Sequence, residues 1–218
     1  MSNSIAELAP CAQRHLREYT DPHGTYAFAL YDVQGDPRSV SVLDCLAPVL
    51  LSVKVSGTAV IEMHKKGTAG AALLGAMRDV LADPQCDTAD FISADINGHA
   101  LRLVADAIRK TKDVHGIKAV TVTKILHRKR PDLIPLIDQL VYKFCTGKVL
   151  PPSPYDASVQ QFWVALQRDL RANKDWLAEL ARPFSTPDRR PLSLLRAADI
   201  IIWHHAYTGC TGDGVSTR

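Results

Sequence analysis

Apolar positions along most of this chain recur at the spacing of an α-helix. Leu101, Val104 and Ile108 lie three or four positions apart, which places their side chains on one face of a helix. A β-branched segment at 119–126 and a segment opened by Pro135 continue the pattern, because proline suits the first position of a helix. Further helices are predicted at residues 3–19, 42–53, 69–82, 157–172, 174–182 and 191–206. We therefore expect an all-α fold.

One segment departs from this helical pattern. Residues 26–32 read Tyr-Ala-Phe-Ala-Leu-Tyr-Asp, and they predict one short N-terminal strand or an extended arm. No internal repeat or long low-complexity linker divides the chain. We expect a single, mostly helical domain over residues 1–218, with a core near 97–146 and C-terminal helices near 157–206.

The composition is that of a folded globular protein. Of the 218 residues, 46% are hydrophobic and 22% are charged, which excludes a disordered chain. No apolar run approaches the roughly 18 residues of a membrane-spanning helix. The first residues lack the basic start and apolar stretch of a signal peptide. We expect a soluble, cytoplasmic protein with no membrane attachment.

The five cysteines are odd in number and far apart: Cys11, Cys45, Cys86, Cys145 and Cys210. Such spacing argues against a disulfide framework and against a zinc knuckle. We expect these cysteines to be reduced and mostly buried. The sequence predicts no metal site and no cofactor.

Positive charge is concentrated in one segment. Residues 109–130 contain eight Lys or Arg residues and one acid, Asp113, whereas the whole chain has a net charge of +3. A basic segment on a near-neutral body is typical of a protein that binds a polyanion. A solvated helical face with lysines near a helix C-terminus explains the same charges equally well.

A glycine turn lies inside this basic segment. Gly116 permits a sharp turn between two helices. The backbone amides that begin the next helix can bind a phosphate, assisted by Lys118 and Lys124. Contacts to a neighbouring phosphate are expected from the basic residues that follow, which are His127, Arg128, Lys129 and Arg130.

Three aspartates near these helices have both structural and chemical interpretations. Asp138 falls in the first turn of the helix opened by Pro135, where the helix dipole favours its ionised form. Asp132 is interpreted as a turn or capping residue. Asp199 is interpreted as a hydrogen-bonding residue on a buried helix face.

The motifs Gly116-Ile117, Thr123-Lys-Ile-Leu, Lys129-Arg-Pro, Leu133-Ile-Pro and Ile137-Asp138 together form a pattern. This pattern resembles the helix-hairpin-helix DNA glycosylase superfamily. In that superfamily a hairpin with a glycine turn grips a DNA phosphate, and a later aspartate stabilises the sugar oxocarbenium ion and orients a water molecule. Asp138 lies 22 positions after Gly116. The resemblance implies a glycosylase-like core, DNA as the partner, and Asp138 as the catalytic residue.

Over most of its length the chain is similar to an uncharacterised actinobacterial family of helical proteins. The segments that carry this likeness are Asp44-Cys-Leu-Ala-Pro-Val-Leu-Leu-Ser and Leu195-Arg-Ala-Ala-Asp-Ile-Ile-Ile-Trp. That family has no established activity to transfer.

The chain also departs from the glycosylase pattern. Lys118 replaces the second glycine of the usual turn, and Val122 replaces the small residue usually packed in the hairpin. The lysine nucleophile of bifunctional glycosylases falls near Val120, so Schiff-base lyase chemistry is not expected. The dispersed cysteines do not predict an iron–sulfur cluster.

Three functions remain open from the sequence. The first is a monofunctional N-glycosylase that removes a base from DNA, with Asp138 as the catalytic carboxylate and a flipped base held by aromatic side chains. The second is a DNA-binding protein that has the hairpin without the chemistry. The third is a small-molecule enzyme or binder on the same helical scaffold. The aromatic residues available for a base pocket are Tyr142, Trp163, Trp176, Trp203 and Tyr207. Each of them is more commonly a core residue, because aromatic side chains supply large buried area in any domain.

Overall fold

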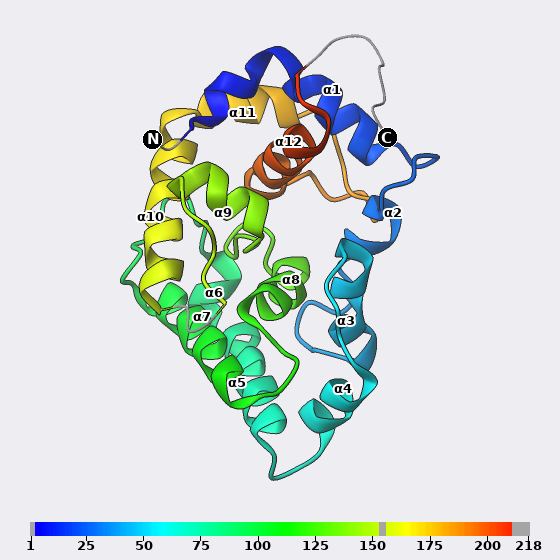
Figure 1. Ribbon diagram of the computed structural model, residues 1–218, viewed down its shortest axis with the longest axis vertical. Coiled ribbons are helices and arrows are strands. Elements are labelled where there is room, and N and C mark those ends of the chain that lie inside the picture. The colour runs from blue at the N-terminus through cyan, green and yellow to red at the C-terminus, as the bar shows by residue number, and fades with distance from the viewer. Residues whose placement is uncertain (1–2, 153–155, 211–218) are drawn as a thin grey trace.

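The computed structural model describes residues 3–152 and 156–210, and within them the fold is all-α, as predicted (Figure 1). These residues form twelve α-helices and three short 3-10 helices, and no strand of a sheet. The elements are η1 (Ile5–Leu8), α1 (Ala9–Thr20), α2 (Phe28–Tyr31), α3 (Val42–Leu46), η2 (Ala47–Leu51), α4 (Gly57–His64), α5 (Ala69–Ala82), α6 (Pro84–Thr88), α7 (His99–Arg109), η3 (Lys110–Asp113), α8 (Ala119–Lys129), α9 (Gln139–Thr146), α10 (Asp156–Ala172), α11 (Lys174–Ala181) and α12 (Leu194–Thr208).

Two helices form the centre of the molecule. Helix α12 packs against α1, α9 and α11, and α8 packs against α3, α5, α7 and η2. Side chains on all sides of α12 are buried, including Leu195, Ala198 and Ile201. A helix that is apolar all round belongs in a core. One contiguous hydrophobic core runs from Ile5 to Ile202.

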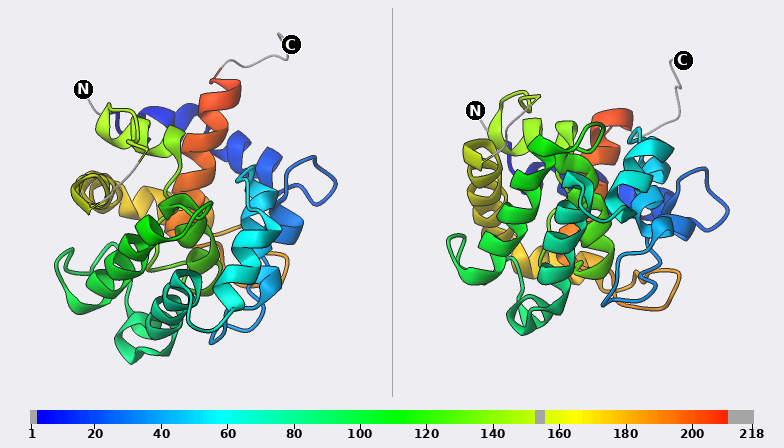
Figure 2. Two further views of the ribbon diagram at one scale, coloured as in Figure 1. Left: turned by 60° about the horizontal axis from the view of Figure 1, so that its bottom comes forward. Right: turned by 90° about the horizontal axis from the view of Figure 1, so that it is seen from below.

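Helices α3 and α4 lie on the opposite side of the molecule from α10, as both views of Figure 2 show. Helix α4 packs closely against α5. A side chain at Gly70 would approach the backbone of Glu62 and Met63 to 2.7 Å, so this crossing requires a glycine. No helix in the described part of the chain is long and apolar enough to cross a membrane.

The prediction of a strand or an extended arm at residues 26–32 was wrong. Residues 28–31 form α2 instead. Phe28 and Tyr31 are buried while Leu30 is 66% exposed, so the apolar period here is three and not two. The Tyr31 hydroxyl donates to the carbonyl oxygen of Lys124 at 2.7 Å, which attaches α2 to α8.

The helix predicted from Pro135 begins later, at Gln139. The backbone between α8 and α9 is held by side chains of α8: Thr123 Oγ1 accepts from the Ile137 amide at 3.2 Å, and His127 Nδ1 lies 2.7 Å from the Ile134 carbonyl oxygen. These contacts satisfy the buried backbone groups without a helix. Asp138 is therefore the N-cap of α9 and not a residue of its first turn.

Two cysteines differ from the sequence expectation. Cys11 and Cys210 form a disulfide, so the expectation of reduced thiols was wrong for this pair. Cys45, Cys86 and Cys145 are free and buried, as predicted.

Candidate functional site

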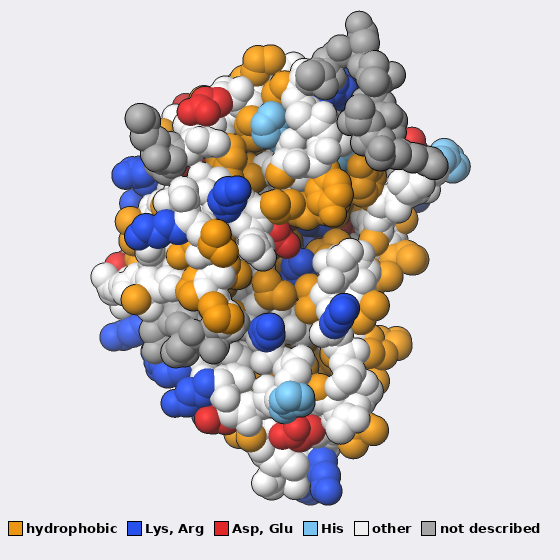
Figure 3. All heavy atoms as spheres, in the orientation of Figure 1, with side chains coloured by type: hydrophobic (Ala, Val, Ile, Leu, Met, Phe, Trp, Pro, Cys, Tyr) orange, Lys and Arg blue, Asp and Glu red, His pale blue; other side chains and the backbone are white. Residues whose placement is uncertain are grey.

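A cleft of about 1420 Å³ opens beside the N-terminal ends of α8 and α9. Its walls come from these two helix ends, from α12, from the loop at 50–54 and from residues 25–27. Figure 3 shows acidic and basic side chains at the base of a hollow that hydrophobic side chains border. Charged groups at the base of such a hollow interact more strongly than they would in bulk water.

Asp138 is one of the two acids that line the cleft. Its Oδ1 accepts from the Leu140 amide at 2.9 Å, which caps α9. Its Oδ2 lies 3.5 Å from Lys124 Nζ. The helix N-terminus and the lysine both orient this side chain. The Asp138 side chain is 20% exposed to solvent, so it is accessible to a bound molecule.

Lys124 lines the same cleft but is nearly buried. Its Nζ donates to the Leu51 carbonyl oxygen at 3.1 Å and faces Asp138. The structure therefore places Lys124 as the partner of the predicted catalytic acid, and not on the surface where a phosphate would lie.

Asp199 is the second acid of the cleft. Burial, with a smaller effect of the negative charge of Asp138, raises the pKa of Asp199 to about 6, against the opposing effect of Arg196 and Lys124. Arg196 lies one turn earlier on α12 and donates to Asp199 Oδ2. Two carboxyl groups of unlike environment in one cleft are typical of acid–base chemistry.

Sequence reasoning missed Asp199 as a site residue. Asp199 lies on α12, between Ala198 and Ile200 in a largely apolar stretch. The available signal was a charged pair, Arg196 and Asp199, three positions apart within that apolar stretch. Such a pair is rare in a core unless it binds or holds something.

Arg196 is the buried cation that organises this part of the cleft. Its Nε and Nη2 donate to the two carboxylate oxygens of Asp32 at 2.7 and 2.8 Å, and Nη2 also donates to the Tyr19 hydroxyl at 3.2 Å. The bidentate pair fixes the plane of the guanidinium group. Asp199 is thereby held by a side chain that cannot easily rotate.

Aromatic rings form the upper wall of the cleft. Tyr19 stacks on Tyr26 with ring centroids 4.9 Å apart, and Trp203 stacks on Tyr207 at 4.6 Å. Tyr26 and Trp203 meet edge to face at 6.1 Å. All four residues line the cleft. The wall offers flat apolar surfaces of the kind that stack on a planar ligand.

Of the aromatic residues predicted for a base pocket, Trp203 and Tyr207 are in this wall. Tyr142 and Trp163 belong to the hydrophobic core, and Trp176 packs against that core. None of these three lines the cleft, so they have the core role that large aromatic side chains more commonly take.

The turn at Gly116 lies at the rim of the cleft. Gly116 has φ +79°, the left-handed conformation that favours glycine. Gly116 and Lys118 both line the cleft and are both exposed. Two further exposed lysines, Lys54 and Lys143, line it as well.

The sequence profile of a family of unknown function matches residues 12–206. The chain belongs to that family, DUF6308. The match covers nearly the whole chain and includes every residue of the cleft named above except Tyr207. No curated protein and no solved structure matches this member of DUF6308.

In this DUF6308 chain the basic residues after Lys124 point inward. Arg128 donates to Asp44 Oδ1 at 2.7 Å, and Lys129 Nζ lies 2.8 Å from the same oxygen. Both side chains also donate to carbonyl oxygens of residues 31–34. These two cations therefore attach the N-terminal segment to α8. The expectation that they face a phosphate does not agree with their burial.

His127 and Arg130 are buried in the same way. Burial, with a smaller effect of the charge of Arg196, lowers the pKa of His127 to about 3, so its imidazole is neutral. Arg130 donates to the carbonyl oxygens of Pro37 and Leu81 and lies 3.0 Å from Asp87. Neither side chain is presented to solvent as an anion-binding group.

Proposed function

We propose that this protein hydrolyses an N-glycosidic bond and removes a base from DNA. The observation that carries the proposal is the pairing of two carboxyl groups, Asp138 and Asp199, in one aromatic-walled cleft whose rim holds the Gly116 turn. The predicted catalytic residue and the predicted phosphate-binding turn thus border one cavity.

Asp138 is suited to the part of the reaction that carries positive charge. When the bond between C1′ and the base nitrogen breaks, its electron pair leaves with the base and C1′ becomes an oxocarbenium ion. An ionised carboxylate beside C1′ stabilises that ion and takes a proton from the attacking water. Lys124 and the α9 amide hold Asp138 in place.

Asp199 is suited to the part of the reaction that needs an acid. Its pKa of about 6 leaves a protonated fraction near neutral pH. A protonated carboxyl group can donate to the departing base, while the water oxygen bonds to C1′ and its proton goes to Asp138. The C1′–N bond is thus replaced by a C1′–O bond, one proton passes from Asp199 to the base, and one passes from water to Asp138.

The remaining parts of the cleft suit a nucleotide. Ligand pockets commonly have volumes of about 300–1,000 Å³, so the cleft of about 1420 Å³ has room for a flipped base and its sugar. Tyr26 and Trp203 offer surfaces for stacking. The exposed Lys118 beside the Gly116 turn would contact one backbone phosphate.

The test is base release by wild-type protein and by Asp138→Asn. The substrates are short duplexes and single strands that carry uracil, hypoxanthine, an alkylated purine or an oxidised purine at one position. Released base is measured by mass spectrometry, and abasic sites are revealed by alkali. We expect Asp138→Asn to lose base release while it still binds DNA in a fluorescence-anisotropy titration.

Asp79→Asn is the matched control, because Asp79 is an exposed aspartate on α5 away from the cleft. Equal base release by Asp138→Asn and wild type would contradict the proposal. So would DNA binding with no base released from any substrate at any protein concentration.

A second candidate is a hydrolase of free nucleosides. The burial of Lys124, His127, Lys129 and Arg130 favours it, because these side chains are not available to hold a DNA strand. Base release from nucleosides, with no release from oligonucleotides, would support this candidate over the first.

A further inference from the structure

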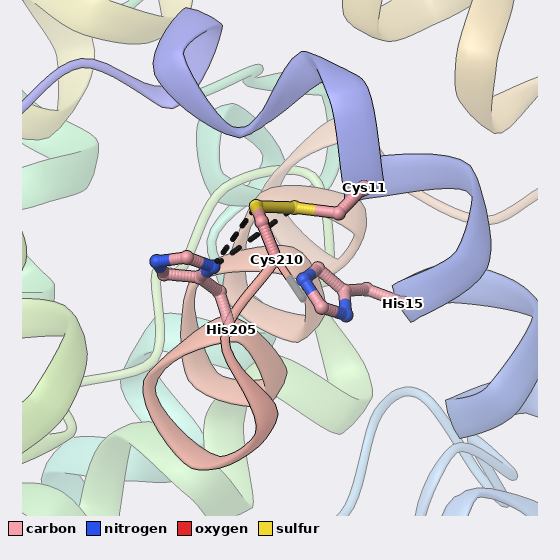
Figure 4. A group of neighbouring side chains, drawn as sticks. All are labelled: Cys11, His15, His205 and Cys210. Atoms are coloured by element: carbon pink, nitrogen blue, oxygen red, sulfur yellow. Dashed lines mark hydrogen bonds between the residues drawn. A yellow bond between two sulfur atoms is a disulfide. The ribbon is translucent and has the colours of Figure 1, made fainter. Parts of the chain in front are cut away.

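Four side chains with metal-binding atoms meet where α1 passes the end of α12: Cys11, His15, His205 and Cys210 (Figure 4). Their candidate ligand atoms all lie within 4.8 Å of one another. None of the four lines the cleft described above. This group, here called the Cys–His cluster, therefore has no part in the proposed hydrolysis.

The fold brings these residues together from the two ends of the chain. Cys11 and His15 are one turn apart on α1, so both face the same side of that helix. His205 lies in the last turn of α12, which packs on α1. Gly209, with φ +66°, ends α12 and returns the chain so that Cys210 lies beside His205. Arg14 donates to the Gly209 carbonyl oxygen at 2.9 Å and holds this turn.

One buried nitrogen of the cluster lacks a protein partner. His15 is completely buried, and its Nδ1 lies 2.9 Å from Nδ1 of His204. Its other nitrogen, Nε2, has no hydrogen-bond partner among the described residues. A ring nitrogen of His15 points toward the two sulfur atoms in Figure 4. A buried imidazole nitrogen without a partner is unfavourable, and a metal ion would satisfy it.

The distances in the cluster suit a tetrahedral metal ion. His205 Nδ1 lies 3.4 Å from Cys210 Sγ and 3.9 Å from Cys11 Sγ. With bonds of about 2.3 Å to sulfur and 2.0–2.1 Å to nitrogen, the ligand atoms of tetrahedral zinc are about 3.3–3.8 Å apart. The two sulfurs are joined in this structure as a disulfide, so a metal requires that bond to be reduced.

We propose that the reduced protein binds one zinc ion through Cys11, His15, His205 and Cys210. Two thiolates and two imidazoles are a common ligand set of structural zinc sites. A phosphine reductant takes the oxygen of one water molecule to become a phosphine oxide, and the disulfide gains the two protons and two electrons. Zinc then displaces the two thiol protons. The ion would join α1 to the end of α12, the same segments that the disulfide joins in the oxidised protein.

The experiment uses the full chain, reduced with a phosphine, freed of metal with a chelator and kept without oxygen. Cobalt(II) is the spectroscopic probe, and zinc is then added to displace it. We expect one cobalt ion per chain, near-ultraviolet bands from thiolate ligation and the intense visible bands of a tetrahedral ion. The oxidised form of the same chain is the first control, and it should lack all of these bands.

Variants then identify the ligands. Cys210→Ser removes an exposed ligand near the end of the described chain. It should weaken zinc binding by more than the 10–100-fold typical of a residue that only supports a ligand. Glu18→Gln is the matched control, because Glu18 belongs to a neighbouring group with His15 and His204. It should leave zinc binding unchanged.

Two outcomes would overturn the proposal. One is a reduced, folded protein, checked by circular dichroism, that binds no cobalt. The other is cobalt binding that Cys210→Ser leaves intact and Glu18→Gln abolishes, which would assign the metal to the neighbouring group.

Discussion

Arg196 and Asp199 lie one turn apart on α12, and the arginine Nη1 donates to the aspartate Oδ2 at 2.5 Å. The same guanidinium group holds Asp32 through its other nitrogens. One buried guanidinium group thus contacts two carboxyl groups, of which Asp199 has a pKa raised to about 6, mainly by burial. The stability and the pH response of the cleft both depend on this arrangement.

Asp199→Asn is expected to change how stability depends on pH. The pKa of Asp199 is higher in the folded protein, about 6, than its ordinary value of 3.8. Its contribution to stability is therefore fully present below about pH 4 and is lost as the pH rises to about 6. A shift of this size corresponds to a contribution on the order of 3 kcal/mol.

Urea unfolding at intervals between pH 4 and 7 measures this contribution. The free energy of unfolding of Asp199→Asn should lack the fall with rising pH that Asp199 gives the wild type, whereas Asp79→Asn should keep it. The pKa of the buried His127 is lowered to about 3, so its contribution to stability rises with pH and opposes that of Asp199. Only the difference between the variants isolates Asp199, and identical pH profiles would contradict this assignment.

Substitution of Arg196 by methionine should destabilise the protein strongly. It leaves the carboxylates of Asp32 and Asp199 buried without their cation, and breaking such a buried pair costs about 3–5 kcal/mol. Arg196→Lys keeps the charge but loses the bidentate contact. Its free energy of unfolding should therefore lie between those of Arg196→Met and the wild type. Urea unfolding near pH 7 provides the measurement.

The matched control for Arg196 is Arg182→Ala. Arg182 forms an exposed ion pair with Glu179, and such pairs contribute about 0–1 kcal/mol. Equal losses from the two arginines would mean that the buried network is not a main source of stability.

Helical periodicity was sufficient to predict the fold class and most helix positions. The pattern at Leu101, Val104 and Ile108 gave α7, and the apolar stretch near 191–206 gave α12. The prediction for residues 26–32 was wrong because the helix there, α2, has only four residues, too few for a helical repeat to be recognised. The helix at Pro135 failed because side chains of α8, which are distant in sequence, satisfy the backbone before Gln139.

The candidate site could be predicted only in part, because burial is not local information. Gly116 and Asp138 were singled out by the resemblance to the helix-hairpin-helix glycosylases, and both border the cleft. The sequence of residues 127–130 does not show whether these basic side chains face a phosphate or an internal acid such as Asp44. Their role depends on the segment near residues 31–37, which folds over α8. The Cys–His cluster joins residues 11–15 to residues 205–210, and nothing in the sequence shows that these two segments meet.

Gly116→Ala should destabilise the turn at the rim of the cleft. The residue has φ +79°, and an L residue in the left-handed region costs about 1–2 kcal/mol. Space is not the obstacle, because the nearest atom to an added side chain would be 3.7 Å away. The midpoint of urea unfolding should therefore fall.

Gly75→Ala is the matched control for the same chemical change. Gly75 lies within α5, and an added side chain would meet nothing within 4 Å. Alanine in a helix interior is about 0.8–1.0 kcal/mol more favourable than glycine, so this variant should be stabilised. A Gly116→Ala protein as stable as Gly75→Ala would contradict the conformational argument.

Lys118→Gln should weaken DNA binding without affecting the fold. Lys118 is exposed at the rim of the cleft, beside the turn that is proposed to hold a phosphate. Loss of one phosphate contact should lower the slope of log affinity against log salt by about 1, uniformly across sequences. Fluorescence anisotropy with one duplex at several salt concentrations measures this slope.

Lys174→Gln is the matched control. Lys174 is an exposed lysine on α11 that does not line the cleft, so its replacement should leave the slope unchanged. If both variants bind like wild type, the Gly116 turn is not the DNA contact, and the hydrolase of free nucleosides becomes the better account of the cleft.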